Sequence, residues 1–347
     1  MLTELIQHIR PALGLAQKQD IQTAARHLGR FVQHNQTGEP IALGDDCAAI
    51  PDGEGYLLLA AEGLWPPLVE ADPWFAGWSA VLVNVSDIYA MGGRPLAVVD
   101  ALWSPSTTQA DVLWQGMVAA SQAFKVPIVG GHTNCHSPYS ALSVAILGRA
   151  TRLISSFAAQ PGQILALATQ LTGQLHPQYP FWDGATQADP ADLQRQLAVL
   201  PAIAEQGLCG AGKDVSMGGI LGTTLMLLET SGCGAVVDVA AIPRPDAVPL
   251  ETWLRCFPSY GFLLTVTPQD FATVQQQFQA VGITCAAIGH IVAEPRLTLT
   301  QGDETAVFWD FSIQPLTGFA PSASVATTSG PTEPAVTEPA ATDGIPR

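Results

Sequence analysis

The chain has 347 residues, of which 48% are hydrophobic and 13% charged, and its 14 basic residues against 30 acidic ones give a net charge of −16. A length of this size predicts about two domains, and so negative a charge repels nucleic acids and anionic membrane surfaces. We therefore expect neither nucleic acid nor a membrane as a partner, and no apolar stretch is long enough to span a bilayer. The six cysteines contain no C-x-x-C pair, which favours reduced thiols and a cytoplasmic protein.

Hydropathy and composition divide the chain into four segments. Apolar residues recur at helical spacing through residues 1–34, which predicts a helical lead-in. Alternating strand and helix patterns over 35–155 predict an α/β or α+β domain, and a similar mixture over 156–318 predicts a second one. Residues 319–347 are mostly Pro, Ala, Thr, Ser and Glu, which cannot offset the entropy lost on ordering, so a disordered tail is expected.

The same patterns predict individual helices and strands. In the first domain they predict strands near Tyr56–Ala61, Leu96–Leu102, Val126–Val129 and Leu142–Gly148, and helices at Pro73–Met91 and Gln109–Phe124. In the second domain they predict helices at Leu193–Gln206, Gly218–Thr230 and Phe271–Val281, and strands that include Gln163–Ala168 and Phe262–Val266.

Three short acidic segments place carboxylates in apolar surroundings: Gly44-Asp45-Asp46-Cys47-Ala48, Asn84-Val85-Ser86-Asp87 and Lys213-Asp214-Val215-Ser216. A lone charge is costly in such a setting, so a cation is expected to offset it. On the predicted helix, Asn84 and Asp87 lie three residues apart and point the same way. Asp214 precedes the start of another predicted helix, where anions are attracted. We interpret the segments as parts of one divalent-metal and polyphosphate site.

Each motif taken alone also has an ordinary structural explanation. Asp87 could form an ion pair or cap a neighbouring element, Gly44–Asp46 could be a surface turn, and Asp214 could be a helix N-cap. The segment Gly130–Asn134 follows a strand that is expected to be buried. Its two glycines would let backbone amides approach a phosphate, or they could simply connect two strands.

Two other kinds of site have weaker support. Residues 207–214 nearly match the phosphate-loop pattern G-x-x-x-x-G-K-[ST], but Asp214 stands where Ser or Thr is needed and a predicted helix precedes the segment where a strand is needed. We therefore do not expect a P-loop. A zinc site is the other possibility, with residue types that suit the metal but no evident fourth ligand: His132, Cys135 and His136.

Taken together and in this order, the motifs resemble the superfamily of ATP-dependent enzymes that contains aminoimidazole ribonucleotide (AIR) synthetase, selenophosphate synthetase, thiamine-monophosphate kinase and the hydrogenase-maturation dehydratase. The resemblance covers roughly residues 40–300, and Asn84–Pro95 is its most specific match. It implies an α+β fold of two domains, in which the first pairs with its copy in a second subunit to build a β-barrel and the second is an α/β sandwich. It also implies a homodimer, with ATP and Mg²⁺ as cofactors.

Carried over to this sequence, the resemblance implies that Asp46, Asp87 and Asp214 are magnesium ligands and that the last two are catalytic. Glu62 would be a further ligand, at a point where the kinase and selenophosphate enzymes carry Asp. Six more residues would bind or assist at the nucleotide phosphates: Asp45, Asn84, Gly130, Gly131, His132 and Ser216.

The departures from the family pattern concern the acceptor. Met217 replaces the second acidic residue of the kinase's D-V-S-D motif, and Pro258–Gly261 replaces its G-E-D-Y-E segment, which argues against thiamine phosphate. The N-terminus offers Lys18 but no cysteine before Cys47, which argues against selenide. The leading hypothesis is a Mg²⁺-dependent enzyme that transfers or uses the γ-phosphoryl group of ATP on an unidentified small metabolite. The alternative is a non-catalytic nucleotide-binding or scaffold subunit that kept the fold and lost the acceptor site.

Overall fold

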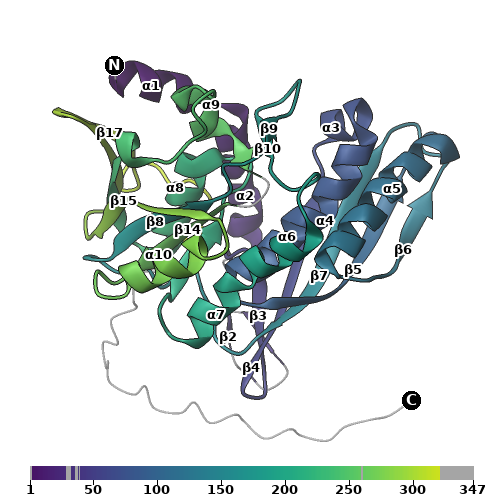
Figure 1. The fold of residues 1–347 in the computed structure, drawn as a ribbon, viewed down its shortest axis with the longest axis horizontal. Coiled ribbons are helices and arrows are strands. Elements are labelled where there is room, and N and C mark those ends of the chain that lie inside the picture. Colours follow the sequence, from purple (N-terminus) through teal and green to yellow (C-terminus); the bar gives the residue numbers. More distant parts are fainter. Residues whose placement is uncertain (1, 29–32, 36–37, 39, 259–260, 321–347) are drawn as a thin grey trace, which may run out of the picture.

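A computed structural model describes residues 2–28, 33–35, 38, 40–258 and 261–320. The chain forms two sheet-and-helix units that lie side by side, with the helix α2 between them (Figure 1). Most of the segment expected to be a tail, residues 321–347, lies outside the described residues. None of the described helices is long and apolar enough to cross a membrane.

The first unit is a mixed five-stranded sheet with helices on one face (Figure 1). Its strand order is β3-β4-β7-β5-β6, and only β5 and β6 run parallel. The strands are β3 (Ala48–Asp52), β4 (Gly55–Gly63), β5 (Arg94–Trp103), β6 (Ile128–Asn134) and β7 (Ala141–Ala150). The helices are α3 (Pro66–Ala71), α4 (Pro73–Ala90) and α5 (Thr107–Phe124). The predicted helices of this domain are therefore confirmed to within two residues at each end.

One expectation about this sheet is wrong. The segment Gly130–Asn134 was expected to be a loop after a strand at Val126–Val129, but it is the strand β6 itself. The reason is tertiary pairing, because β6 runs parallel to β5 and aligns Gly131 with Asp100. A Cβ atom on Gly131 would lie only 1.9 Å from Oδ1 of Asp100, so only glycine allows this close approach.

The face of this sheet that turns away from the helices is apolar and open. Along β7, side chains alternate between the buried helix side and the other side. On the face away from the helices, Leu59 of β4 is opposite Leu147 of β7. Val99 of β5 lies on the same face, opposite Ala145, which is two residues before Leu147 on β7. Leu59, Leu147 and Val99 are 47%, 37% and 42% exposed, so the sheet presents an uncovered apolar surface.

The second unit is a seven-stranded mixed sheet with helices on both faces. Its order is β11-β14-β8-β15-β12-β16-β17. The strands are β8 (Ile164–Thr169), β11 (Ala211–Asp214), β12 (Gly234–Asp238), β14 (Gly261–Val266), β15 (Thr284–Val292), β16 (Arg296–Gln301) and β17 (Glu304–Asp310). The helices are α6 (Pro190–Leu197), α7 (Val199–Glu205), α8 (Gly219–Ser231), α9 (Leu250–Arg255) and α10 (Phe271–Gln279), with a 3₁₀ turn at Val239–Ala241. Two small sheets complete the described structure: β1 (Gln33–His34) with β2 (Pro40–Ile41), and β9 (Gln174–Leu175) with β10 (Phe181–Asp183) and β13 (Phe257–Pro258).

Two hydrophobic cores follow from the alternation along the central strands of the second sheet. On β8, Leu165 and Leu167 point to one core, which also contains α8, while Ala166 and Ala168 point to the other. That second core continues into the first unit through residues such as Val85 of α4. The two units are therefore packed against one another through a shared apolar interior.

The N-terminal helices pack on the second unit. Helix α1 (Leu2–Ile9) contacts α9 and β17, and α2 (Leu13–Leu28) contacts α8. Gly14 makes the second contact possible, since a Cβ atom there would lie 1.9 Å from the carbonyl oxygen of Met217. Helix α2 is thus held against the turn between β11 and α8.

A buried carboxylate fixes the last described segment of the chain. Glu229 of α8 is 2% exposed and accepts hydrogen bonds from the backbone amides of Leu316 (2.8 Å), Thr317 (2.7 Å) and Gly318 (3.2 Å). The Thr317 hydroxyl donates to the same carboxylate at 2.6 Å. Phe319 then packs against Gly44, where φ is +113° and a Cβ atom would lie 2.7 Å from the Phe319 side chain. Residues 316–319 are therefore held against the loop that carries the first acidic motif.

Candidate functional site

A cavity of about 670 Å³ lies where the two units and helix α2 meet. Its wall includes Lys18 from α2, Glu62 at the end of β4, Asp87 from α4 and Ser216 after β11, together with Phe319. Elements from both units and from the N-terminal lead-in therefore build one compartment, which has the size of a small-molecule site.

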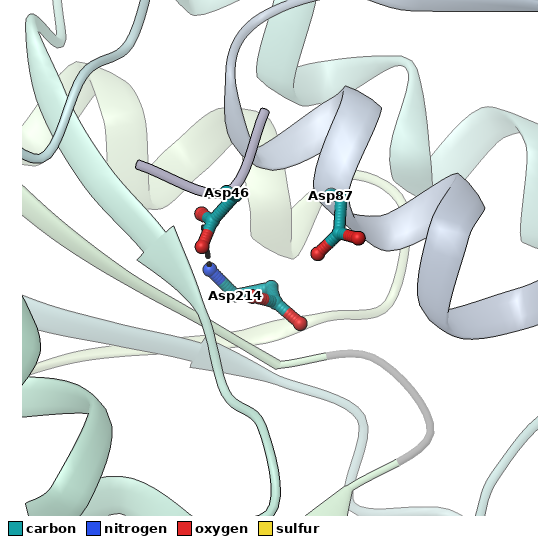
Figure 2. A group of neighbouring side chains, drawn as sticks. All are labelled: Asp46, Asp87 and Asp214. Carbon is teal, nitrogen blue, oxygen red and sulfur yellow. Dashed lines mark hydrogen bonds between the residues drawn. The ribbon is translucent and has the colours of Figure 1, made fainter. Parts of the chain in front are cut away.

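Three carboxylates converge in this cavity. Asp46 comes from the loop before β3, Asp87 from the last turn of α4, and Asp214 from the end of β11. One oxygen atom of each lies within 4.8 Å of the other two, and Figure 2 shows the three side chains close together. The structure thus brings together three aspartates that are 41 to 168 positions apart in the sequence.

Local structure positions each of these side chains. Helix α4 begins with Pro73 after Asp72, whose side chain accepts a hydrogen bond from the Phe75 amide, and the helix is buried along most of its length. This burial carries Asp87 into the interior, where it is 5% exposed. Asp214 is also 5% exposed, and it ends an edge strand that pairs with β14. Burial in both cases removes the water that would otherwise solvate the charge.

The oxygen atoms of the three aspartates differ in what they contact. The ammonium group of Lys213 forms an ion pair with Oδ1 of Asp46, and the Asp214 amide donates to Oδ2 of Asp46 at 3.3 Å. By contrast, Oδ2 of Asp87 is buried with no hydrogen-bond partner among the described residues. Asp46 is therefore already paired with a cation, whereas Asp87, which lines the cavity, keeps one buried oxygen atom without a partner in the described structure.

Burial and mutual repulsion change the ionisation of the cluster. Burial raises the pKa of Asp87 well above its usual value, and the charges of Asp214 and Glu62 raise it further. The pKa of Asp214 is also raised well above its usual value, first by burial and then by Asp46. For Lys213, burial alone would lower the pKa, but Asp46 and Asp45 outweigh it and the pKa is raised. The cluster carries more negative charge than Lys213 can offset, which favours a further cation.

Four other predicted residues lie in or beside the cavity. Asp45 accepts hydrogen bonds from the Ser155 hydroxyl (2.6 Å) and the Ser156 amide (3.0 Å), so it ties its own loop to the segment after β7. Glu62 lines the cavity and is exposed to it, but the surrounding wall limits its solvation. This desolvation raises its pKa, although the charge of Lys18 acts in the opposite direction.

The remaining two differ in their access to the cavity. Ser216 lines it, and its buried hydroxyl has no hydrogen-bond partner within the described chain. Asn84 is fully buried and donates to the Ala80 carbonyl at 2.8 Å, while its side-chain oxygen has no partner in the described structure. Asn84 does not line the cavity, so any effect it has on the site would pass through its neighbours on α4.

Three predicted phosphate contacts lie elsewhere. Gly130, Gly131 and His132 belong to β6, at the far edge of the first sheet, and none of them lines the cavity. Three strand-to-strand steps separate β6 from β4, which corresponds to about 14 Å. His132 instead contacts the Trp103 ring, with 5.7 Å between the ring centroids. Within one described chain, these residues therefore do not join the carboxylate cluster.

The two alternative sites can also be compared with the structure. Residues 211–214 of the near-match to a phosphate loop form the edge strand β11, and α8 begins only at Gly219. Among the described residues, the side chains close enough to one another to share a metal ion are Asp46, Asp87 and Asp214. The three candidate zinc ligands near β6 do not form such a group in the described structure.

Sequence reasoning missed the role of Lys213. Its side chain is 6% exposed and is paired with Asp46, 167 positions away. A signal was present in the sequence. Lys213 stands in a mostly apolar segment directly before Asp214, and a lysine is almost never fully buried without a partner. The pattern alone could not say which carboxylate the ammonium group would find.

Family models match both units. The model described as AIR synthase related protein, N-terminal domain, matches residues 44–150, and the one described as AIR synthase related protein, C-terminal domain, matches residues 162–302. The chain belongs to the AIR synthase related family. The two-domain α+β architecture expected from the sequence is thereby confirmed, while the β-barrel across two subunits stays a prediction.

Relatives of this AIR synthase related protein include uncharacterised and named proteins. An uncharacterised protein of Synechocystis sp. is 58% identical over 320 residues, which are 92% of this chain and 99% of that protein. A thiamine-monophosphate kinase of Synechococcus elongatus is 27% identical over 293 residues, 76% of this chain and 88% of the kinase. Among solved structures, T. maritima PurL complexed with ADP matches with a TM-score of 0.69 and 19% identity, over 93% of this chain and 55% of PurL. The last likeness shows the fold alone.

Proposed function

We propose that this AIR synthase related protein is a Mg²⁺-dependent enzyme that transfers or uses the γ-phosphoryl group of ATP on a small-molecule acceptor. One observation carries the proposal, namely that Asp46, Asp87 and Asp214 present oxygen atoms within 4.8 Å of one another inside a cavity between the two domains. The similarity to a thiamine-monophosphate kinase and to a PurL structure that contains ADP supports ATP as the nucleotide.

The carboxylates fit a magnesium ion in chemistry and in spacing. Mg²⁺ prefers oxygen ligands, and two ligands on opposite sides of one ion lie about 4.2 Å apart. Oδ2 of Asp87 is buried and without a hydrogen-bond partner in the described structure, as expected for an atom that a cation is to contact. Asp46, Asp87 and Asp214 would hold the metal, with Glu62 nearby on the cavity wall. When bound, Mg²⁺ would neutralise charge on the phosphates during transfer.

The remaining residues of the cavity would bind and orient. We assign the catalytic positions to Asp87 and Asp214, which are both buried. Burial and then the charge of Asp214 raise the pKa of Asp87, and burial and then the charge of Asp46 raise the pKa of Asp214. Ser216 would donate its free hydroxyl to a phosphate, and Asp45 would position the Asp46 loop through its bonds to the segment after β7. Positioning and electrostatic stabilisation are the usual sources of catalysis in phosphoryl transfer.

Removal of magnesium should weaken nucleotide binding strongly. Only two basic residues line the described cavity, Lys18 and Lys213, so the charge of a triphosphate cannot be offset by basic side chains alone. We expect the affinity for a non-hydrolysable ATP analogue to fall at least about 100-fold in EDTA, since the loss of a divalent ion next to three phosphates is worth several kcal/mol. Isothermal titration calorimetry with and without magnesium measures this.

Equal affinity in EDTA and in magnesium would disprove the metal assignment. Turnover of ATP with a panel of small metabolites then separates the enzyme from the non-catalytic subunit considered above, because only an enzyme releases phosphate or forms a phosphorylated product.

We further propose that the protein is a homodimer that pairs the open faces of its first sheets. The apolar side chains of Leu59, Val99 and Leu147 on this face would be covered by the second subunit. Because Gly130 aligns with Val99 and His132 follows two positions later on the same strand, both lie on this face. Their contact with nucleotide phosphates is therefore proposed for the dimer and not for the single chain.

A charge on the open face should prevent this dimer. We expect Val99→Glu to convert the protein from dimer to monomer, because pairing would bury an uncompensated carboxylate. The matched control is Val118→Glu on α5, since Val118 is 41% exposed and Val99 is 42% exposed. Sedimentation velocity measures the mass of each variant. A wild-type monomer, or a Val99→Glu dimer as tight as the wild type, would contradict the proposal.

A further inference from the structure

Lys213 is the most deeply placed basic group of the cavity. The chain has only three lysines, Lys18, Lys125 and Lys213, and two of them line the cavity, which no described arginine lines. Lys213 is 6% exposed in its side chain, and its ion-pair partner Asp46 is 4% exposed. A lysine and an aspartate buried together in this way are costly to separate unless another partner replaces each of them.

Both oxygen atoms of Asp46 already have a partner. Oδ1 faces the Lys213 ammonium group and Oδ2 accepts from the Asp214 amide at 3.3 Å. Asp87, in contrast, keeps an oxygen atom without a partner in the described structure. A divalent ion that enters the cluster would find Asp87 open but would meet Lys213 in competition for Asp46.

An ammonium group released from Asp46 has few other places to go. It would remain inside a cavity whose charged wall residues are otherwise Lys18 and the carboxylates Asp45, Glu62, Asp87 and Asp214. The phosphates of a bound nucleotide would be the new anions in that compartment. Exchange of a carboxylate for a phosphate keeps the ammonium group paired throughout.

We propose that Lys213 is a tethered cation of the carboxylate cluster, which competes with the divalent ion for Asp46 and moves its ammonium group to a nucleotide phosphate when the ion binds. This inference rests on the proposed function, and it assigns to Lys213 a part of the positive charge that the phosphates need. Lys213 is thus a phosphate-binding residue that also sets the affinity of the empty site for metal.

The competition can be measured without nucleotide. Binding of Mn²⁺ to the nucleotide-free protein, followed by electron paramagnetic resonance, should become about tenfold tighter in Lys213→Met, because a cation in contact with a ligand has been removed. Lys18→Met is the matched control, since it removes the same charge from the same cavity but Lys18 has no ion pair with a described residue. We expect its Mn²⁺ affinity to change by less than about threefold. Mn²⁺ affinity in Lys213→Met that is unchanged or weaker would overturn the proposal.

The transfer to phosphate is tested in the wild-type chain, so that it does not depend on the folding of a variant. Labelling with ¹³Cε-lysine gives three signals in the nuclear magnetic resonance spectrum. Addition of Mg²⁺ and a non-hydrolysable ATP analogue should shift the Lys213 signal and leave that of Lys125, exposed at the end of α5, in place. If calorimetry shows binding of the analogue but the Lys213 signal does not move, this inference fails and the proposed function stands. If the wild type binds no analogue, the proposed function fails, and the Mn²⁺ titration still decides the competition.

Discussion

Substitution of Asp87 by Asn should reduce ATP turnover at least about 1,000-fold, because a lost metal ligand removes several kcal/mol of charge stabilisation in the transition state. Asn has nearly the same shape as Asp but carries no charge. Asp87 lies on the buried side of α4, where the residue is 5% exposed, so Asn should fit the same space. The variant should therefore fold normally. The loss of turnover is measured as phosphate release at saturating Mg²⁺ and ATP. The assay includes any small metabolite that raises phosphate release by the wild type.

The control for Asp87→Asn is the same substitution at Asp111, an exposed carboxylate on the neighbouring helix α5, which should leave turnover unchanged. Thermal unfolding in EDTA provides a second readout. Burial and the charges of Asp214 and Glu62 raise the pKa of Asp87, so a neutral side chain at this position should not destabilise the metal-free protein at pH 7. Full turnover in Asp87→Asn would remove Asp87 from the catalytic site.

Substitution of Glu229 by Ala should destabilise the protein by about 3–5 kcal/mol, since it leaves buried amide groups without an acceptor and removes charge-assisted hydrogen bonds. The carboxylate is 2% exposed and accepts from three backbone amides and one hydroxyl between Leu316 and Gly318. Release of this segment would also free Phe319 from Gly44 at the edge of the cavity. Urea unfolding monitored by tryptophan fluorescence measures the change in the free energy of unfolding.

Glu205→Ala is the matched control for Glu229→Ala. Glu205 forms an ion pair with Arg94 at the surface, where the two side chains are 36% and 54% exposed. Solvent screens such a pair, so its loss should cost no more than about 1 kcal/mol. If both substitutions lower the free energy of unfolding by an equally small amount, Glu229 does not hold the 316–319 segment in solution.

Much of the framework follows from local patterns. The apolar periodicity of residues 73–91, together with Pro73 at the start and Gly92 at the end, predicts helix α4 and therefore the spacing of Asn84 and Asp87. The acidic motifs and their order likewise indicate the family, which the family models confirm. These features could be predicted because each depends on residues close together in the sequence.

The same local patterns fail where pairing is long-range. The segment Gly130–Asn134 has the composition of a loop, yet its pairing with β5 makes it a strand and keeps it away from the cavity. Asn84 shares a helical face with Asp87 in the sequence, but burial under neighbouring elements keeps it off the cavity wall. Strand pairing and burial are properties of the whole fold, and they override the preference of a short segment.

By itself, the sequence determined the family, most of the helices and strands, and the candidate carboxylates, because caps, periodicity and short motifs each act over a few residues at a time. Only the tertiary structure decided that Lys213 pairs with Asp46, that α2 forms one wall of the cavity, and that Glu229 holds residues 316–318. Each of these contacts joins positions far apart in the chain. Their partners are selected by burial, since a charge removed from water is stable only beside the group that the fold brings to it.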